Sequence, residues 1–347
     1  MRIVVCSGGT GGHMFPACAL FLAAKRKGHD ATIITDKRGE AFCSNISGKI
    51  VLNTVRFSYE NLLDIACYSL LTAIKFLKLW IRVRPDVVIG FGGIFTVIPI
   101  LIAKVLGSKI VVYEQNSVLG KANKFLERFA DLKLASFRLN GSWIHVPPIV
   151  RDEFIKNSMH EYKCDGIIKI LIIGGSQGAA SFSRIVPQAL ATLSSKEREN
   201  IEIIQQASDC DKLGQTYKDL GVRATLKQFL NNVAEIMQSS QVVICRSGAS
   251  TLSELSAIGR PAVLIPYPGA ADNHQFYNAT YYKSKKAAWV LEENDGIAEE
   301  LGNILRQILE NRELLKKMSS HITGISTCSA DDFIELVERI FCQSFHY

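Results

Sequence analysis

Two glycine-rich turns are the parts of this 347-residue chain whose residue types and spacing best suit chemistry. The first is Gly8–His13 and the second is Gly174–Gly178, and each follows a short apolar run and contains a hydroxyl side chain. Glycine lets backbone N–H groups converge on an anion, and a helix that begins at the turn adds the positive end of its dipole. Both turns therefore predict binding of a phosphate or a sugar diphosphate. His13 is a candidate general base or ligand-binding group, with a structural or solvated imidazole as the alternative.

A third segment, Cys245–Glu254, also leads from an apolar run into a helix. Its hydroxyl side chains and backbone amides suit a diphosphate at the helix N-terminus. Glu254 is expected in the first turn of that helix, where its carboxylate either favours the helix dipole alone or accepts both hydroxyls of a ribose. The loop Pro266–Gln275 adds candidates for binding sugar hydroxyls, namely Asp272, Asn273 and Gln275.

Other common site types lack the residues that they need. A dinucleotide fingerprint would require glycine at Met14, and no Gly-Lys-Ser/Thr follows either turn, which excludes a P-loop. The triplet Asp209–Asp211 has the letters of a metal-binding Asp-x-Asp pair but lies in a polar loop away from the glycine turns. The nine cysteines include no C-x-x-C pair, so neither zinc nor a disulfide framework is expected. We therefore expect no metal, no cofactor and a reducing, cytosolic compartment.

The positive charge is confined to the first half of the chain. Residues 1–151 carry 20 Lys and Arg against 9 Asp and Glu, a net charge of +11, whereas residues 152–347 carry 20 against 24, or −4. This asymmetry indicates an anionic partner for the first half, namely nucleic acid, an acidic membrane face or a phosphorylated substrate. A solvated basic surface is the alternative.

The elements that must position these residues are short apolar strands alternating with amphipathic helices. Such strands are typical of a parallel sheet with helices on both faces, so the fold class is α/β. Proline is tolerated in a first helical turn, so Phe15-Pro16 is expected to open the first helix. Because Ile170–Gly178 repeats the pattern of Ile3–Gly12, we expect two Rossmann-like domains facing a cleft, with a linker at residues 152–164. The predicted strands are Ile3–Cys6, Ala31–Thr35, Val87–Gly90, Ile110–Tyr113, Ile168–Ile173, Ile201–Gln205, Val242–Cys245 and Ala262–Pro266.

The segment Leu62–Arg84 predicts an amphipathic helix with an unusually wide apolar arc. Charged residues interrupt it, so we do not expect it to span a membrane. A wide apolar arc beside a basic stripe is typical of a peripheral membrane contact, and burial of the helix on two sides is the alternative. The expected membrane contacts are Ile74, Lys75, Phe76, Lys78, Leu79 and Arg82.

Six segments, in this order along the chain, together resemble one family. They are Gly8–His13, Pro85–Gly93, Glu114–Asn116, Gly174–Gly178, Cys245–Ala249 and Asp272–Ala279. Any one of them is a weak signal, but six in sequence are specific, and the likeness covers nearly the whole chain. The family is that of the bacterial undecaprenyldiphospho-muramoylpentapeptide β-N-acetylglucosaminyltransferases.

This resemblance implies the GT-B glycosyltransferase fold. It implies an acceptor- and membrane-facing domain at residues 1–151 plus 329–347, and a UDP-N-acetylglucosamine-binding domain at residues 165–328. The implied reaction moves N-acetylglucosamine, with inversion, to the 4-hydroxyl of the N-acetylmuramoyl unit of lipid I and so forms lipid II for peptidoglycan synthesis. The implied location is peripheral, on the cytoplasmic face of the cell membrane, beside membrane-associated proteins of cell-wall synthesis and without nucleic acid.

The resemblance also implies substrate contacts, position by position. Thr10, Gly11 and Gly12 would lie near the reacting sugar and the acceptor diphosphate, and Asn116 near N-acetylglucosamine. For the donor, Arg151 and the backbone of Leu230 would contact the uracil, Ser176 the phosphates, and Gln275 the sugar hydroxyls. The residues implied at the phosphate and the ribose are Ala249, Ser250, Thr251, Leu252, Ser253 and Glu254.

Four positions depart from the family pattern. Ile94 stands in place of an aromatic residue, Tyr113 in place of histidine, Pro148-Ile149 in place of Asn-Pro, and His274 in place of glutamine. Tyr113 matters most, because a duty assigned to that imidazole cannot operate here. His13 therefore becomes the candidate base.

Two further side chains are expected to assist the reaction. Glu114 lies beside Asn116 and either takes part in catalysis or fixes a neighbouring turn. Arg246, together with the helix N-termini that follow Ser176 and Ser247, is expected to stabilise the charge of the leaving diphosphate. A solvated surface position is the alternative for both Arg151 and Arg246.

Three rival functions stay open. An NAD-dependent oxidoreductase would use Asp36, after the second strand, to bind a ribose. A sugar-nucleotide epimerase of the same fold would bind the same donor without needing a lipid-binding surface. A non-catalytic nucleotide-sugar binder at the membrane would keep the donor unchanged.

Overall fold

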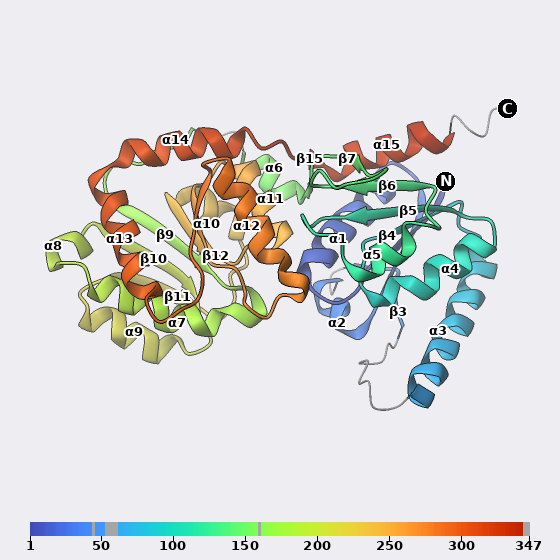
Figure 1. Ribbon diagram of the computed structural model, residues 1–347, viewed down its shortest axis with the longest axis horizontal. Helices are drawn as coiled ribbons and strands as arrows, with labels where there is room; N and C mark the ends of the chain where they lie inside the picture. The colour runs from blue at the N-terminus through green and yellow to red at the C-terminus, as the bar shows by residue number, and fades with distance from the viewer. Residues whose placement is uncertain (44–45, 53–61, 159–160, 343–347) are drawn as a thin grey trace. The chain divides into compact units, whose positions relative to one another are not determined.

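The chain divides into two compact units, each built around its own parallel sheet (Figure 1). The computed structural model describes residues 1–43, 46–52, 62–158 and 161–342. Unit 1 comprises Met1–Asp152 and Cys328–Tyr347, and unit 2 comprises Glu153–Thr327. The predicted α/β class is confirmed.

Unit 1 contains a seven-stranded sheet in the order β3-β2-β1-β4-β5-β6-β7, and every neighbouring pair is parallel. The strand order reverses between β1 and β4. In a doubly wound sheet, ligands bind at the carboxyl ends of the strands at this point. The strands are β1 (Arg2–Cys6), β2 (Asp30–Thr35), β3 (Lys49–Val51), β4 (Val87–Gly90), β5 (Lys109–Glu114), β6 (Leu132–Ala135) and β7 (Ile144–His145).

Helices cover both faces of this sheet, which explains why its central strands are apolar throughout. Alternate residues enter different cores: Ile3 and Val5 of β1 enter one, and Val4 and Cys6 enter the other. The helical elements are α1 (Gly11–Arg26), α2 (Lys37–Glu40), η1 (Ala41–Cys43), α3 (Leu62–Val83), η2 (Ile94–Thr96), α4 (Val97–Val105), α5 (Lys121–Leu126) and α15 (Ala330–Cys342). Helix α6 (Asp152–Lys156) begins at the boundary and belongs to unit 2 from Glu153 onward.

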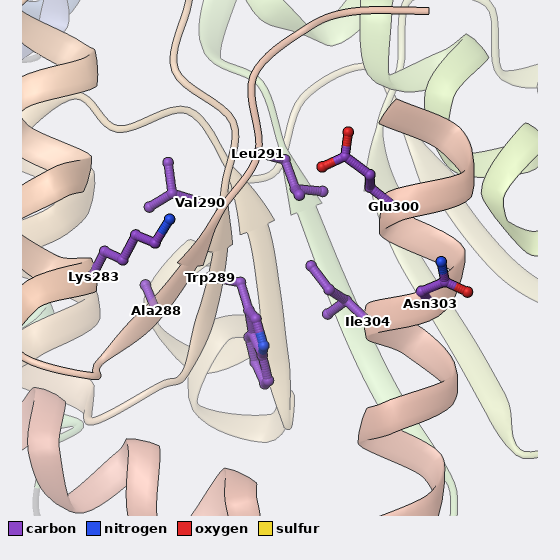
Figure 2. A pocket seen from close by; sticks show the side chains of 8 residues that line it. All are labelled: Lys283, Ala288, Trp289, Val290, Leu291, Glu300, Asn303 and Ile304. Atoms are coloured by element: carbon purple, nitrogen blue, oxygen red, sulfur yellow. The ribbon is translucent and has the colours of Figure 1, made fainter. Parts of the chain in front are cut away.

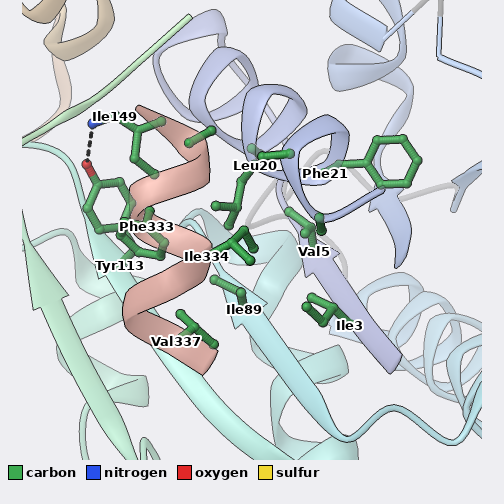
Figure 3. Close-up of a cluster of buried hydrophobic side chains, with 14 of the residues drawn as sticks. Ile3, Val5, Leu20, Phe21, Ile89, Tyr113, Ile149, Phe333, Ile334 and Val337 are labelled. Carbon is green, nitrogen blue, oxygen red and sulfur yellow. Dashed lines mark hydrogen bonds between the residues drawn. The ribbon is translucent and has the colours of Figure 1, made fainter. Parts of the chain in front are cut away.

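The C-terminal helix α15 packs into unit 1 beside α1 (Figure 3). Phe333 meets the ring of Tyr113 edge-on at 5.2 Å. Two ion pairs, Arg26–Asp331 and Lys27–Glu335, and a hydrogen bond between His29 and Glu338, each of 2.7 Å, join the α1 end of the unit to successive turns of α15. The short strand β15 (Cys328–Ser329) also pairs in parallel with β8 (Ile149–Val150).

Unit 2 repeats the same topology. Its six parallel strands run in the order β11-β10-β9-β12-β13-β14, with the reversal between β9 and β12. The strands are β9 (Ile168–Ile173), β10 (Ile201–Gln206), β11 (Arg223–Lys227), β12 (Val242–Cys245), β13 (Ala262–Leu264) and β14 (Ala288–Val290). The helical elements are α7 (Gly175–Ala191), α8 (Ser195–Arg198), α9 (Cys210–Asp219), α10 (Val233–Ser239), α11 (Ala249–Ile258), η3 (Ala271–Asn273), α12 (His274–Ser284), α13 (Ile297–Glu310) and α14 (Arg312–Thr323).

Two local predictions were wrong, those for the start of α1 and for the place of Glu254, whereas the linker stays a prediction. Helix α1 begins at Gly11, so Pro16 lies inside it rather than opening it; the carbonyl of Thr10 already accepts the N–H groups of His13 and Met14 at 3.1 Å. The expected linker holds the short helix α6 and a buried Cys164. Glu254 is the sixth residue of α11, beyond its first turn.

Candidate functional site

The turn after β1 meets the N-terminus of α1 at the point where the unit 1 strand order reverses. Gly9 has φ +88°, a conformation that favours glycine, and Thr10 is the N-cap residue of α1 with no side-chain cap. Thr10 Oγ1 lies 3.4 Å from His13 Nδ1. The turn thus places His13 at the start of α1, where the side chain of Thr10 does not cap the backbone N–H groups. This geometry suits the binding of an anion, with His13 as a base beside it.

Asp36 holds this turn in place. Its carboxylate accepts hydrogen bonds from the N–H of Gly9 at 3.1 Å, the N–H of Gly39 at 2.8 Å and the guanidinium of Arg38 at 3.0 and 3.1 Å. Burial alone would raise the pKa of Asp36, but these hydrogen bonds outweigh it and lower the pKa below its ordinary value. The carboxylate is therefore engaged within the fold, which argues against its use as the ribose-binding acid of a dehydrogenase.

Glu114 organises the loop after β5. One oxygen accepts the backbone N–H and the side-chain amide of Asn116 at 3.0 and 3.1 Å, and the other accepts the N–H of Gly120 at 3.1 Å and the amide of Asn123 at 2.8 Å. Burial raises the pKa of Glu114, and the four hydrogen bonds oppose that shift. Glu114 therefore fixes the turn that follows β5, which is the second of its two expected roles, and a catalytic role stays a prediction.

The loops after β1, β4 and β5 lie against one another. A Cβ on Gly93 (φ +81°) would lie 3.7 Å from the carbonyl oxygen of Gly8, and one on Gly92 (φ +82°) would lie 3.1 Å from Asn123 Nδ2. The structure therefore brings together the predicted residues Thr10, Gly11, Gly12 and His13 with the loop that carries Asn116. Sequence analysis missed Asn123, because only the structure shows that this polar residue is buried in the short helix α5.

Tyr113, which replaces the family's histidine, is a core residue. Its hydroxyl contacts Ser136 Oγ and accepts the N–H of Ile149 at 3.4 Å (Figure 3). Burial raises its pKa. The hydroxyl is thus engaged inside unit 1, consistent with the expectation that this position does not supply a base here.

Arg151 belongs to unit 1, where its guanidinium lies 4.5 Å from the ring centroid of Phe15. Phe15 in turn meets Phe42 edge-on at 5.3 Å. Both rings press on the start of α1, because a Cβ on Gly11 would lie 2.8 Å from Phe15 and 3.1 Å from Phe42. Arg151 is therefore stacked against the first turns of α1 rather than solvated.

In unit 2, the starts of α11 and α12 are tied together. Ser247 Oγ donates to the carbonyl of Gln275 at 2.7 Å, and Asn278 Nδ2 donates to the carbonyl of Ser247 at 3.2 Å. Gly248, the N-cap residue of α11, offers no side-chain cap, and no acidic residue lies in the first turn. This helix N-terminus is therefore suited to an anion.

The loop before α12 stores backbone strain beside this helix start. Asp272 and Asn273 adopt φ +50° and +52°, the left-handed region that non-glycine residues rarely occupy. Gln275 fixes the loop, because its Oε1 accepts the N–H of Tyr267 at 3.0 Å. Strain of this kind gathers at ligand-binding sites, at a cost of about 1–3 kcal/mol per residue.

The residues of α11 that are predicted to bind the sugar nucleotide differ in how far their side chains are exposed. Leu252, Ser253 and Glu254 are buried, so direct contact from this helix falls to its backbone amides and to the half-buried side chains of Ser250 and Thr251. Ala249 is also buried, and Leu230 is buried in the loop before α10. Ser176 lies in the first turn of α7, and its side chain is outside the described part of the structure.

Arg246, expected at the leaving diphosphate, is engaged within unit 2. Its guanidinium donates to the carbonyls of Ile265 and Pro266 at 3.0 and 3.1 Å and to Ser181 Oγ at 2.7 Å, and it forms an ion pair with Glu293. The group is buried and lies 4.8 Å from the ring centroid of Phe182. Arg246 therefore connects the segment after β13, helix α7 and the segment after β14, and it is not solvated. A contact with the leaving diphosphate stays a prediction.

The Asp-x-Asp letters at Asp209–Asp211 have a structural explanation. Asp209 Oδ1 accepts the N–H of Lys212 at 3.0 Å and so caps α9, which explains why an aspartate stands at the first position of the Asp-x-Asp letters.

A pocket of about 370 Å³ lies along the edge strand β14, between α12 and α13 (Figure 2). Its walls include Lys283, Trp289 and Glu300 but none of the predicted site residues.

The expected membrane helix α3 has one packed face and one exposed face. Phe76 is buried against the α4 side of the unit 1 core, so the expectation that it contacts a membrane was wrong. Leu79 is only partly buried there, and its membrane contact stays a prediction. The other expected contacts, Ile74, Lys75, Lys78 and Arg82, are exposed. Exposed apolar side chains beside them are Leu70, Leu71, Leu77 and Ile81. Within the described ranges, no helix combines the length and apolar character needed to cross a bilayer.

Comparison with known proteins identifies the family of this chain. Residues 3–133 match the glycosyltransferase family 28 N-terminal domain, and residues 169–336 match the glycosyltransferase family 28 C-terminal domain. The chain belongs to glycosyltransferase family 28. The two family 28 domains fall within units 1 and 2, apart from the end of the second match, which reaches into α15.

Curated relatives of this family 28 chain carry one name. A Rickettsia felis protein is 36% identical, with 98% of this chain and 99% of the relative covered, and a Rhizobium meliloti protein is 35% identical, with 92% and 89% covered. Both are named UDP-N-acetylglucosamine–N-acetylmuramyl-(pentapeptide) pyrophosphoryl-undecaprenol N-acetylglucosamine transferase.

Solved structures share the fold at lower identity. A crystal structure of Acinetobacter baumannii MurG matches with a TM-score of 0.80 at 24% identity, covering 98% of this chain and all of that one. A putative UDP-N-acetylglucosamine 2-epimerase from Listeria monocytogenes matches with a TM-score of 0.70 at 14% identity, covering 99% and 97%. The likeness to the epimerase is one of fold, whereas the full-length sequence likeness is to the transferases.

Proposed function

We propose that this chain transfers N-acetylglucosamine from UDP-N-acetylglucosamine to the 4-hydroxyl of the N-acetylmuramoyl unit of lipid I, with inversion, and so forms lipid II for peptidoglycan synthesis. The observation that carries the proposal is the 36% identity to a transferase of this name over 98% of the chain. The repeated Rossmann-like topology supports it. In each unit, a helix whose N-terminus has no side-chain cap follows one of the two strands between which the strand order reverses: α1 follows β1 in unit 1, and α11 follows β12 in unit 2.

Unit 2 is proposed to bind the donor at the start of α11. The backbone amides of Ala249, Ser250 and Thr251 would hold the diphosphate, and the strained loop before α12 would bring Gln275 to the sugar. As UDP leaves, negative charge grows on the diphosphate, and the positive end of α11, equivalent to roughly half an elementary charge, stabilises it. Arg246 acts in this scheme as a positioning residue, because its Nη1 and Nη2 groups already donate to Ile265, Pro266 and Ser181, although its Nε has no partner among the described residues.

Unit 1 is proposed to bind the acceptor and remove its proton. His13 would act as the general base on the attacking hydroxyl, and Thr10 would orient the imidazole through the 3.4 Å contact with Nδ1. Asn116, held by Glu114, would contact the N-acetylglucosamine. Gly11 and Gly12 would present backbone to the acceptor diphosphate.

The rival functions predict different products. Incubation with UDP-N-acetylglucosamine and a short-chain lipid I is expected to release UDP only when the acceptor is present. An epimerase would instead convert the donor to an isomer, and a binding protein would keep the donor unchanged with or without acceptor. UDP release that does not require lipid I would contradict the proposal.

The exposed face of α3 is proposed to hold the chain at the cytoplasmic face of the membrane. Its apolar side chains, among them Leu70 and Ile81, would enter the interface while Lys75, Lys78 and Arg82 meet anionic head groups. Each basic residue near such a surface contributes about 1 kcal/mol of binding. Contact with other membrane-associated proteins of cell-wall synthesis stays a prediction of the resemblance.

Reversing two charges on α3 tests this face. Lys75→Glu with Lys78→Glu is expected to lower partitioning onto anionic vesicles by at least about tenfold, and the loss should shrink as salt is raised. Vesicle sedimentation measures the effect. The control, Lys316→Glu with Lys317→Glu on α14, makes the same change in net charge on unit 2. Equal losses in the two variants would show that net charge alone matters and would remove α3 from the account.

A further inference from the structure

Gln115 carries a buried amide that the fold does not use. It lies directly after β5, between Glu114 and Asn116, and is 4% exposed. Neither its side-chain nitrogen nor its side-chain oxygen has a hydrogen-bond partner among the described residues. The amides of Asn116 and Asn123 in the same loop, by contrast, both donate to Glu114. Leaving both ends of a buried amide unpaired costs free energy, so the position is unusual unless a partner arrives.

A second polar group on this edge of the sheet is also unpaired. Ser7 follows β1, is 0% exposed, and its Oγ has no partner in the part of the chain that the structure describes. Continued alternation along the two strands places Ser7 on the face of Val5 and Gln115 on the face of Tyr113. Val5 and Tyr113 belong to the same core cluster, the one beneath α1 and α15. Two unpaired polar groups thus share one face and one edge of the sheet, at the strand ends where such folds bind ligands.

We propose that Gln115 is a further substrate-binding residue, whose amide pairs with a neutral hydroxyl or acetamido group of an N-acetylated sugar. This rests on the proposed function, in which both the transferred sugar and the acceptor sugar carry such groups. A primary amide both donates and accepts without charge, which matches these groups better than a phosphate, because a phosphate would leave the amide oxygen unpaired. Its neighbours agree with this role, since Glu114 positions Asn116 at the same loop.

The variant Gln115→Met keeps the length of the side chain and removes both polar ends. Its kcat/KM is expected to fall by roughly ten- to a hundredfold, because a substrate group that should meet the amide is left unpaired. Its melting temperature is expected to stay the same or rise by about 2–4 °C, because an unpaired buried amide has been removed. A residue that serves only the fold would show the opposite pattern, with lower stability and unchanged kinetics.

The kinetic arms identify the sugar that the amide meets. A rise confined to the KM for UDP-N-acetylglucosamine assigns Gln115 to the transferred sugar, and a rise confined to the KM for short-chain lipid I assigns it to the acceptor. The control is Gln238→Met in unit 2, whose side-chain nitrogen is also buried without a partner in the described chain. It should leave both KM values unchanged.

Wild-type kinetics in Gln115→Met would overturn the inference, because the partner of the buried amide would then be an internal water and not a substrate. If that variant does not fold, Gln115→Asn retains the amide but withdraws it by one methylene, and kinetics equal to wild type would overturn the inference equally. Failure of the proposed function is distinct, because the unaltered chain would then release no UDP in the presence of lipid I.

Discussion

Replacement of His13 by alanine is expected to lower kcat by about 10²- to 10⁴-fold, the usual contribution of a general base, while donor affinity stays nearly unchanged. The reason is that His13 lies at the start of α1 in unit 1, whereas the donor is proposed to bind at α11 in unit 2. Steady-state kinetics gives kcat, and calorimetric titration with UDP-N-acetylglucosamine gives the donor affinity.

Two controls separate catalysis from structure. His145→Ala removes an exposed imidazole elsewhere in unit 1 and should leave kcat unchanged. Added imidazole should restore part of the rate of His13→Ala, because a small base can enter the space that the side chain leaves. Equal losses of turnover and donor affinity in His13→Ala would assign the residue to binding and leave the base unidentified.

Replacement of Arg246 by methionine is expected to destabilise unit 2 by about 3–5 kcal/mol, the usual effect of breaking a buried ion pair from one side. The change leaves Glu293 without its partner and frees the carbonyls of Ile265 and Pro266. Hydrogen exchange of β12 and β13 reads this loss within unit 2, which a global melting curve would mix with the behaviour of unit 1.

A double variant, Arg246→Met with Glu293→Met, should recover part of that stability, because no charge is then left unpaired. The sequence-based expectation makes the opposite prediction. If Arg246→Met kept the exchange protection of β12 and β13 but lost affinity for UDP, the guanidinium would be a diphosphate ligand after all.

The central strands could be predicted from sequence because they are buried on both faces. Val242–Cys245, for example, has no polar residue, and both of its neighbours in the sheet are parallel. The edge strands β11 and β14 were not predicted, because Arg223–Lys227 alternates with exposed polar residues and Ala288–Val290 is only three residues long. Short or half-exposed strands depend on a neighbour that local sequence does not reveal.

The candidate site shows a similar division. Glycine turns after β1 and β9 could be placed because the backbone geometry they allow is a local property. The partners of Arg246 and Phe76 could not, because they are distant in sequence: Ser181 and Glu293 for the first, and the α4 side of the core for the second. The partners of Glu114 are only two to nine residues away, but the loop conformation that brings them to one carboxylate is not visible in the sequence. Charge and hydropathy alone fit both a buried and an exposed arginine.

The most direct test of this account is a crystal structure of the chain with UDP-N-acetylglucosamine. The account predicts the diphosphate on the backbone amides of Ala249–Thr251 at the start of α11, with the sugar within reach of Gln275. A donor bound with its diphosphate away from that helix start, or held by a displaced Arg246, would contradict it.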